Sequence, residues 1–242
     1  MNRYTFDLES DGLLEQLTTI HSLVLKNLDT GELLSFNPMH IEEGVKLLSE
    51  ADLIIGHNII KFDIPAIQKV YPWFTIEQSK VLDTLILSRL IWSDLTDKDY
   101  TKIRAGKINL PMKLAGSHSL EAWGWRLGNW KGDYSKERQS DYKEYCTLEG
   151  IEVVYEDMMN YVWGTWSQEM QDYCEQDVEV TEQFWLLIDS KNYAPTAIQL
   201  EHDVAWIIAQ QERNGFGFDL KKAEKLYHEL TLERVELETD LQ

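Results

Sequence analysis

The sequence predicts an α/β fold, in which three consecutive strands are followed by alternating strands and helices. Five segments have the length and apolar pattern of strands: 3–10, 20–27, 32–37, 53–56 and 80–82. Five others place apolar residues at helical spacing: 41–50, 66–70, 83–90, 120–127 and 169–188. Strands that alternate with helices along the chain are typical of an α/β protein.

The first three strands are expected to form the antiparallel part of the sheet. Tyr4, Phe6 and Leu8 alternate with polar residues, so this strand has one apolar face. The turn residues Asp29-Thr30-Gly31 separate the second and third strands. Strands joined by such a short turn pair as a hairpin.

The later elements begin with recognisable capping residues. The apolar run 53–56 has the composition of a buried strand. Asp83 starts helix 83–90, where capping alone accounts for it, and Ser117 or Ser119 can cap helix 120–127. Asp63 precedes Pro65 at a helix start, so a capping role competes with any catalytic role there.

Charge is distributed unevenly. The whole chain of 242 residues has a formal net charge of -19, which is unusual for a protein that binds nucleic acid. Segment 98–118 reverses this trend, with five basic residues and one acidic residue, and its glycines and proline predict a loop. Segment 133–182 is strongly acidic, with fourteen acidic residues against three basic ones.

The composition describes a folded protein with reduced thiols. Hydrophobic residues make up 43% of the chain, enough for a real core. Cys146 and Cys174 have no metal-like spacing and are expected to be free, as in a cytoplasmic protein. No signal peptide or apolar run of membrane-spanning length is present, so we expect no membrane partner and a cytoplasmic location.

The last fifty residues are expected to form a separate helical tail. Residues 191–196 resemble a linker, and two helical patterns follow at 198–213 and 220–241. Two helices bury little surface by themselves, so the tail is interpreted as the beginning of a larger domain. The predicted division is 1–190 and 191–242.

Two carboxylates on the first strand are the first candidates for chemistry. Asp7 and Glu9 are two positions apart and therefore lie on the same face, about 6–7 Å apart. Like charges at this distance repel, and hard divalent cations such as Mg²⁺ relieve the repulsion. A solvent-exposed strand face is the alternative.

The long helix 169–188 supplies a second candidate pair. Asp177 stands in the middle of its apolar face, where a carboxylate is unfavourable unless it is paired or bound to metal. Tyr173 lies one turn earlier on the same side. An acid at the edge of the stripe, paired with a lysine, is the alternative.

Together these groups resemble a known set of motifs. Asp7-x-Glu9, Asn58-x-x-x-Phe62-Asp63 and Tyr173-x-x-x-Asp177 are similar to the three exonuclease motifs of the DEDD (DnaQ-like) superfamily, in its tyrosine branch. The stretches His118 to Gly124, Lys131 to Tyr134 and Gln211 to Phe216 resemble family A bacteriophage DNA polymerases of the phage T-seven type. No polymerase palm or fingers motif is present, so polymerase activity is not expected from this chain alone.

The resemblance implies a fold and an activity. The fold would be RNase H-like, with a mixed five-stranded sheet flanked by helices and followed by a short helical tail. Residues 1–190 would be a 3′→5′ exonuclease domain that proofreads DNA 3′ ends and releases nucleoside monophosphates. Residues 191–242 would be a linker and the N-terminal helices of a truncated polymerase domain.

The resemblance also implies roles for individual residues. Two Mg²⁺ ions, replaceable by Mn²⁺, would be held by four carboxylates: Asp7, Glu9, Asp63 and Asp177. Tyr173 would orient the attacking water. Leu13 matches an apolar position near the terminal base, although an ordinary core leucine is the alternative. Five further residues are candidates for nucleic-acid contact: Asn58, Lys102, Arg104, Lys107 and His118.

Other interpretations use the same residues. An RNase D-like RNA exonuclease would have the same carboxylates, and a non-catalytic nucleic-acid-binding module could share the fold. The expected partners are a single-stranded DNA 3′ end and either the remainder of the polymerase chain or a separately encoded polymerase subunit. For a phage protein, the expected location is the host cytoplasm.

Overall fold

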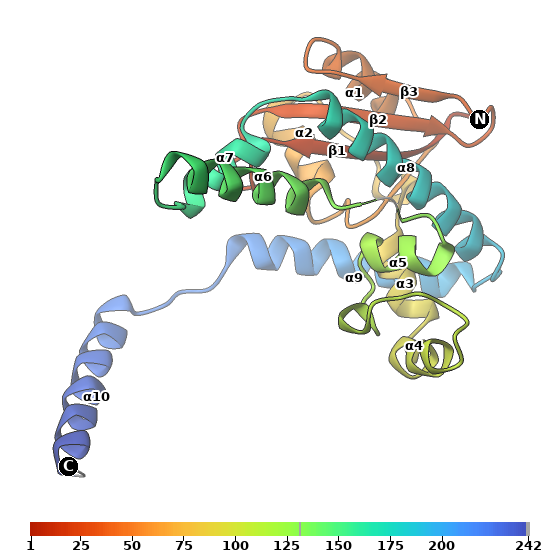
Figure 1. Ribbon diagram of the computed structural model, residues 1–242. Helices are drawn as coiled ribbons and strands as arrows, with labels where there is room; N and C mark the ends of the chain where they lie inside the picture. The colour runs from red at the N-terminus through yellow and green to blue at the C-terminus, as the bar shows by residue number, and fades with distance from the viewer. Residues whose placement is uncertain (131, 241–242) are drawn as a thin grey trace. The chain divides into compact units, whose positions relative to one another are not determined.

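The computed structural model describes residues 1–130 and 132–240, and its centre is a mixed five-stranded sheet. In chain order the strands are β1 (Arg3–Ser10), β2 (Ile20–Asn27), β3 (Leu33–Phe36), β4 (Leu53–Gly56) and β5 (Val81–Asp83). The spatial order is β3-β2-β1-β4-β5 (Figure 1). The predicted α/β, RNase H-like sheet is confirmed.

The strand β1 lies at the point where the sheet changes direction. It pairs antiparallel with β2, placing Asp7 opposite Val24, and parallel with β4, placing Tyr4 beside Ile54. The strand β5 continues the parallel half beside β4. The carboxyl ends of β1, β4 and β5 therefore lie at one edge of the sheet, where ligands bind in open α/β sheets.

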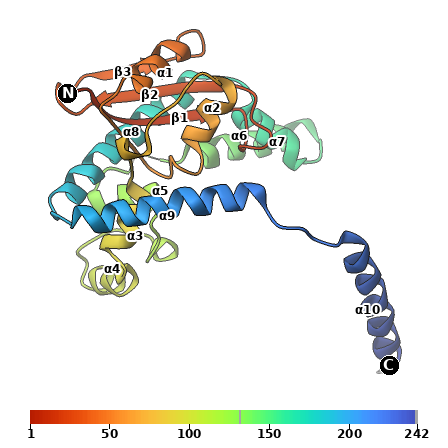
Figure 2. The same cartoon turned by 180° about the vertical axis from the view of Figure 1, so that it is seen from behind.

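Helices cover both faces of this sheet. The described helices are α1 (Ile41–Ser49), α2 (Asp63–Val70), α3 (Thr84–Ile91), α4 (Leu95–Arg104), α5 (Leu120–Leu127), α6 (Tyr134–Glu149), α7 (Tyr155–Trp163), α8 (Gln168–Asp189), α9 (Pro195–Asn214) and α10 (Leu220–Asp240). The long helix α8 packs on β1 and β2 across one face, and α1 and α2 contact β2 from the other (Figures 1 and 2).

The packing of α8 turns the Asp7 face of β1 into a protein interior. Cys174 and Val178 of α8 form a buried cluster with Val24, which is the residue paired with Asp7. Both cysteines are free and buried, as expected. The polar face of the first strand therefore packs against α8, where Asp7 and Glu9 are half-buried and do not form an ordinary solvent-exposed strand face.

The basic segment contains a helix, so the loop predicted over 98–118 was wrong in its first part. Helix α4 runs to Arg104, before the first glycine of the segment at Gly106. Its inward positions are Leu95 and the buried Asp99, and the Asp99 carboxylate accepts two hydrogen bonds from Arg126. A buried acid at a core position conceals the helical period from a hydrophobicity pattern.

Two helices of the acidic segment were not predicted individually. Helices α6 and α7 pack on each other, and α6 is polar on most of its circumference. Its buried residues are Tyr134, Tyr142 and Cys146. Because one aromatic residue per two turns gives a weak periodic signal, the packing of α6 depends on neighbours that are distant in sequence.

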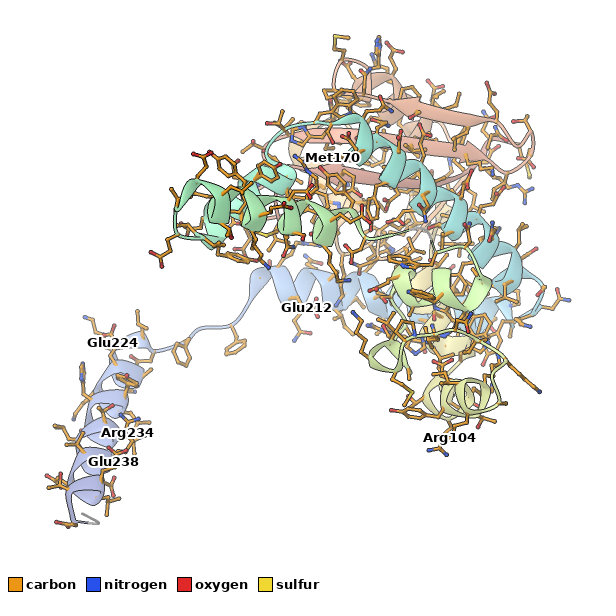
Figure 3. All side chains as sticks on the ribbon, viewed as in Figure 1. Arg104, Met170, Glu212, Glu224, Arg234 and Glu238 are labelled. Atoms are coloured by element: carbon orange, nitrogen blue, oxygen red, sulfur yellow. The ribbon has the colours of Figure 1, made fainter. Side chains whose placement is uncertain are left out.

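The chain divides into two compact units, Met1–Ile207 and Ile208–Gln242. Within the first unit, His202 of α9 is buried and its Nε2 accepts a hydrogen bond of 2.8 Å from the backbone of Asp83. The predicted domain division at residue 190 stays a prediction. The second unit, described to residue 240, has no buried residue in α10, where Arg234 and Glu238 pair one turn apart at 3.6 Å (Figure 3).

Two sequence features extend to positions outside the described residues, namely Lys131 of the resemblance motif and the end of the predicted helix 220–241. Among the helices of the described ranges, none combines the length and the hydropathy that a bilayer crossing requires.

Candidate metal-binding site

Three carboxylates from two distant parts of the chain meet at the carboxyl end of β1. Asp7 and Glu9 lie on the face covered by α8, which contributes Asp177. One carboxylate oxygen of each lies within 4.8 Å of those of the other two. Carboxylate oxygens gathered this closely could hold one hard divalent cation such as Mg²⁺, which takes oxygen ligands.

Asp63 is the fourth predicted carboxylate, and the structure brings it close to the cluster. It is the first residue of α2 and is 3% exposed. The predicted alternative, that Asp63 caps this helix, is wrong, because Phe62 occupies the cap position and no side chain caps α2. The backbone N–H groups of Asp63 and Leu8 offset part of the effect of burial on the pKa of this carboxyl.

Burial raises the pKa of each of the four acids, and repulsion within the cluster adds to this effect for Asp7 and Glu9. Burial, followed by the charges of Asp63, Glu9 and Asp177, raises the pKa of Asp7 well above its usual range. Burial and then Asp177 and Asp63 do the same to the pKa of Glu9. Burial raises the pKa of Asp63 to about 8 and that of Asp177 to about 7. Bound divalent cations would reverse this balance in favour of the charged forms.

Tyr173 lies one turn before Asp177 on α8, and the two side chains are close enough for each to shift the pKa of the other. Burial and the surrounding acids raise the pKa of Tyr173, so the phenol keeps its proton. Its ring packs beside Tyr134 of α6 at a centroid distance of 5.9 Å, and the Tyr134 hydroxyl donates to the carbonyl of Val162 at 3.0 Å. Helices α6 and α7 therefore support the tyrosine.

Asp83 was predicted as a helix cap, and this role is confirmed, since its carboxylate accepts from the backbone of Leu85 at 2.9 Å. It also accepts from the backbone N–H groups of Asn58 at 2.9 Å and Ile60 at 3.1 Å. Asn58 adopts a left-handed conformation with φ 68°, which asparagine tolerates better than most residues. Asp83 therefore fixes the turn that leads to Asp63, a role that its position in the sequence did not indicate.

The residues predicted to contact nucleic acid differ in their exposure to solvent. Lys102, Arg104 and Lys107 are exposed, and Arg104 projects away from α4 (Figure 3). His118 is half-buried, and its Nδ1 is 2.6 Å from the hydroxyl oxygen of Ser88. Leu13 is 72% exposed, so the alternative of an ordinary core leucine is wrong. Contact of any of these residues with nucleic acid stays a prediction.

Sequence reasoning missed two groups, one beside Asp7 and one in the basic segment. The thiol of Cys174 donates to the backbone carbonyl of Asp7 at 3.4 Å, where a larger side chain would displace the strand. The buried pair of Arg126 and Asp99 holds the backbone of Gly116, at 2.9 Å from the Asp99 carboxylate, and so ties the basic segment to α5. The sequence did contain an indication of this ion pair, because Asp99 is the one acidic residue among the lysines and arginine of segment 98–118.

The fold and the acidic cluster define an α/β protein of the RNase H-like class with a candidate divalent-metal site. A solved structure titled "apo form of the nuclease" has the same fold, with a TM-score of 0.50 and 17% identity, over 90% of this chain and 88% of that one. No family model matches the chain.

Two bacteriophage proteins are similar in sequence. The chain is 38% identical over 259 aligned residues to the DNA-directed DNA polymerase of Escherichia phage T7, and equally to that of Enterobacteria phage T3. The alignments include 96% of this chain but span only 35% of each polymerase. The predicted resemblance to bacteriophage DNA polymerases is therefore confirmed over almost the whole chain.

Proposed function

We propose that this chain is a metal-dependent 3′→5′ exonuclease that removes nucleotides from DNA 3′ ends and proofreads for a phage DNA polymerase. The observation that carries the proposal is the convergence of Asp7, Glu9 and Asp177 within 4.8 Å, with Asp63 buried nearby. A protein that needed only a stable fold would gain nothing from four acids that repel one another.

The donor set fits hard divalent cations. All four side chains offer carboxylate oxygens, which Mg²⁺ and Mn²⁺ prefer, and none offers the imidazole or thiolate typical of zinc. Asp7, Glu9 and Asp177 would hold one ion, and Asp7 with Asp63 would hold the second. Two such ions, when bound, would supply activation of a water molecule at neutral pH and stabilisation of the charge that develops during phosphodiester hydrolysis.

The remaining roles belong to the protein. Tyr173 keeps its proton, and its ring is held beside that of Tyr134, so its hydroxyl can orient a water molecule for attack on the terminal phosphodiester. Hydrolysis there breaks the bond to the 3′ oxygen and releases a nucleoside monophosphate. The active form requires ionised carboxylates, which the metals would stabilise against burial.

The exposed lysine and arginine side chains of the basic segment 98–118 are proposed to bind the DNA strand. Lys98 is paired with Asp94 at 2.8 Å, and the one acid within the segment, Asp99, is neutralised by Arg126. Lys102, Arg104 and Lys107 therefore present positive charge without an acid of their own segment facing solvent. A local basic surface can hold a strand although the chain as a whole is acidic.

One assay tests the activity and its direction. Single-stranded DNA, duplex DNA and RNA, each labelled at either end, are incubated with the protein and Mg²⁺, and the products are resolved by size. We expect monophosphates released from the 3′ end of DNA and no release in chelator. An Asp7→Ala, Glu9→Ala double variant with wild-type activity would refute the assignment.

The basic segment is tested separately by the dependence of DNA affinity on salt. Changing Lys102, Arg104 and Lys107 to Gln should lower the slope of log affinity against log salt by up to about 2, since each single-strand phosphate contact contributes about 0.7. The matched control changes three exposed lysines of α10: Lys221, Lys222 and Lys225. Equal slopes in the two triple variants would locate the strand elsewhere.

The partners follow from the relatives. Because this chain spans 35% of the T7 and T3 polymerases, the activity is proposed to serve a polymerase, present either as the remainder of the same chain or as a separate subunit. A preference for RNA in the assay above would favour the RNase D-like alternative, and binding without hydrolysis would favour a non-catalytic module. The host cytoplasm stays the expected location.

A further inference from the structure

The loop 11–19, which follows β1, is held by hydrogen bonds at both of its ends. The Asp11 carboxylate accepts from the backbone N–H groups of Thr18 at 2.8 Å and Thr19 at 3.1 Å, and also from the Thr18 hydroxyl. Three hydrogen bonds to one carboxylate therefore join the start of the loop to its end.

A lysine from another element fixes the middle of the loop. The Lys69 ammonium of α2 donates to the carbonyls of Leu14 at 2.9 Å and Glu15 at 2.8 Å. The backbone N–H of Leu17 donates to the carbonyl of Leu13 at 2.8 Å, and the Leu17 side chain is fully buried. The loop is thus tied to the same helix that begins with Asp63.

These contacts surround a leucine that contributes little to the core. Leu13 is 72% exposed, whereas ordering the backbone around it has an entropic cost. Leu13 follows Glu9 by four residues, so their Cα atoms are at most about 14 Å apart. An exposed apolar side chain on a tied loop, which follows directly from the strand of Asp7 and Glu9, is suited to contact a base next to the bond being hydrolysed.

We propose that Lys69 and Asp11 are positioning residues, which hold Leu13 against the last base pair of a duplex 3′ end so that the end opens. The inference rests on the proposed exonuclease function. Apolar side chains that enter a base stack weaken it. Their effect depends on a rigid mount, because a mobile loop would lose entropy on contact and would insert less often.

The test is the ratio of hydrolysis rates on duplex and single-stranded DNA. In Lys69→Met the ratio should fall by about tenfold, the factor that corresponds to one DNA stacking step, whereas single-strand hydrolysis should stay near wild type. Lys69→Arg should restore the ratio, because a guanidinium can donate to the same carbonyls. The matched control is Lys46→Met, which removes an exposed lysine of α1 that pairs with Glu42.

A double variant shows whether the lysine acts through the leucine. If it does, Lys69→Met combined with Leu13→Ala lowers the ratio no further than Leu13→Ala alone. Additive losses would overturn the inference, because Lys69 would then act independently of Leu13. An unchanged ratio in Lys69→Met would overturn it as well.

A binding measurement separates this inference from the proposed activity. A duplex with a fluorescent adenine analogue at its 3′ end is bound in Ca²⁺, and the increase in fluorescence reports the unstacked base. We expect a smaller increase with Lys69→Met and with Asp11→Ala than with wild type or Lys46→Met. Smaller increases without any hydrolysis in Mg²⁺ would retain the positioning role and refute the exonuclease, whereas equal increases would refute the positioning role.

Discussion

Helices α8 and α10 have similar lengths, 22 and 21 residues, and both were predicted from apolar stripes at helical spacing. Eight residues of α8 are buried, among them Cys174, Val178 and Phe184, and none of α10 is. The acid on the inner face of α8 meets two other carboxylates, whereas the acids of α10 are in solvent. The spacing of apolar residues therefore predicts that a helix forms. Whether its acids are buried or in solvent depends on the elements that pack against it.

The largest expected difference between the two helices is in catalysis. Asp177→Ala should lower the rate of 3′-end hydrolysis by about 10³, because loss of a metal ligand removes several kcal/mol of charge stabilisation. Glu233→Ala, an exposed acid of α10, should leave the rate unchanged. Single-turnover hydrolysis of labelled single-stranded DNA measures both, and comparable rates would remove Asp177 from the site.

Packing should distinguish the two helices almost as strongly. Phe184 of α8 is fully buried and stacks on Trp123 at a centroid distance of 4.1 Å. Its change to alanine should lower the free energy of unfolding by about 3–5 kcal/mol. Leu226 of α10 is exposed, and its change to alanine should have an effect within about 0.5 kcal/mol. Urea unfolding compares the two, and similar losses would mean that α10 has a packing partner.

Changing one tyrosine in each helix should produce a smaller difference in the hydrolysis rate. Tyr173→Phe should lower the hydrolysis rate by about 10², because it removes one oriented hydroxyl and leaves the carboxylates in place. Tyr227→Phe on α10 is the control and should have no effect, since this ring is exposed. A Tyr173→Phe variant as inactive as Asp177→Ala would assign the tyrosine more than the orientation of water.

The smallest expected effect is on stability as a function of pH. Burial raises the pKa of Asp177 from its usual 3.8 to about 7. Between these values the folded protein holds a proton that the unfolded chain releases, so without metal its stability should fall as the pH rises from 4 to 7 and then level off. Asp177→Asn lacks this loss and should be more stable at pH 8 in EDTA, by on the order of 1–3 kcal/mol.

Bound Mg²⁺ should make wild type more stable than Asp177→Asn. Wild type should gain roughly 2.7 kcal/mol at a hundredfold excess of Mg²⁺ over Kd, and Asp177→Asn should gain less. Thermal melting with and without Mg²⁺ measures both shifts. Equal shifts would show that the metal is held by other groups.

The sequence was sufficient for the features that depend on local pattern. The alternation of Tyr4, Phe6 and Leu8 placed Asp7 and Glu9 on one face, and the structure shows that face covered by α8. The position of Asp177 within an apolar stripe predicted an inward carboxylate. These inferences succeeded because strand and helix periods fix the direction of side chains before any tertiary contact forms.

The features that were not predicted depend on contacts between residues that are distant in the sequence. Asp99 is buried because Arg126, 27 residues later, pairs with it, and no local pattern identifies a buried ion pair. Asp83 has the sequence of an ordinary cap, yet it also holds the backbone of Asn58, and its own N–H is bound by His202. Such roles follow from topology, which a single sequence leaves open.

The separation of the acidic residues along the chain has a consequence for synthesis. Asp7 and Glu9 emerge from the ribosome with the first hairpin, and Asp177 follows about ten to thirty seconds later at ordinary elongation rates. Until then a nascent chain carries only part of the carboxylate cluster, and contacts between residues so far apart form late in folding. The chain therefore carries no complete carboxylate cluster while most of it is still being translated.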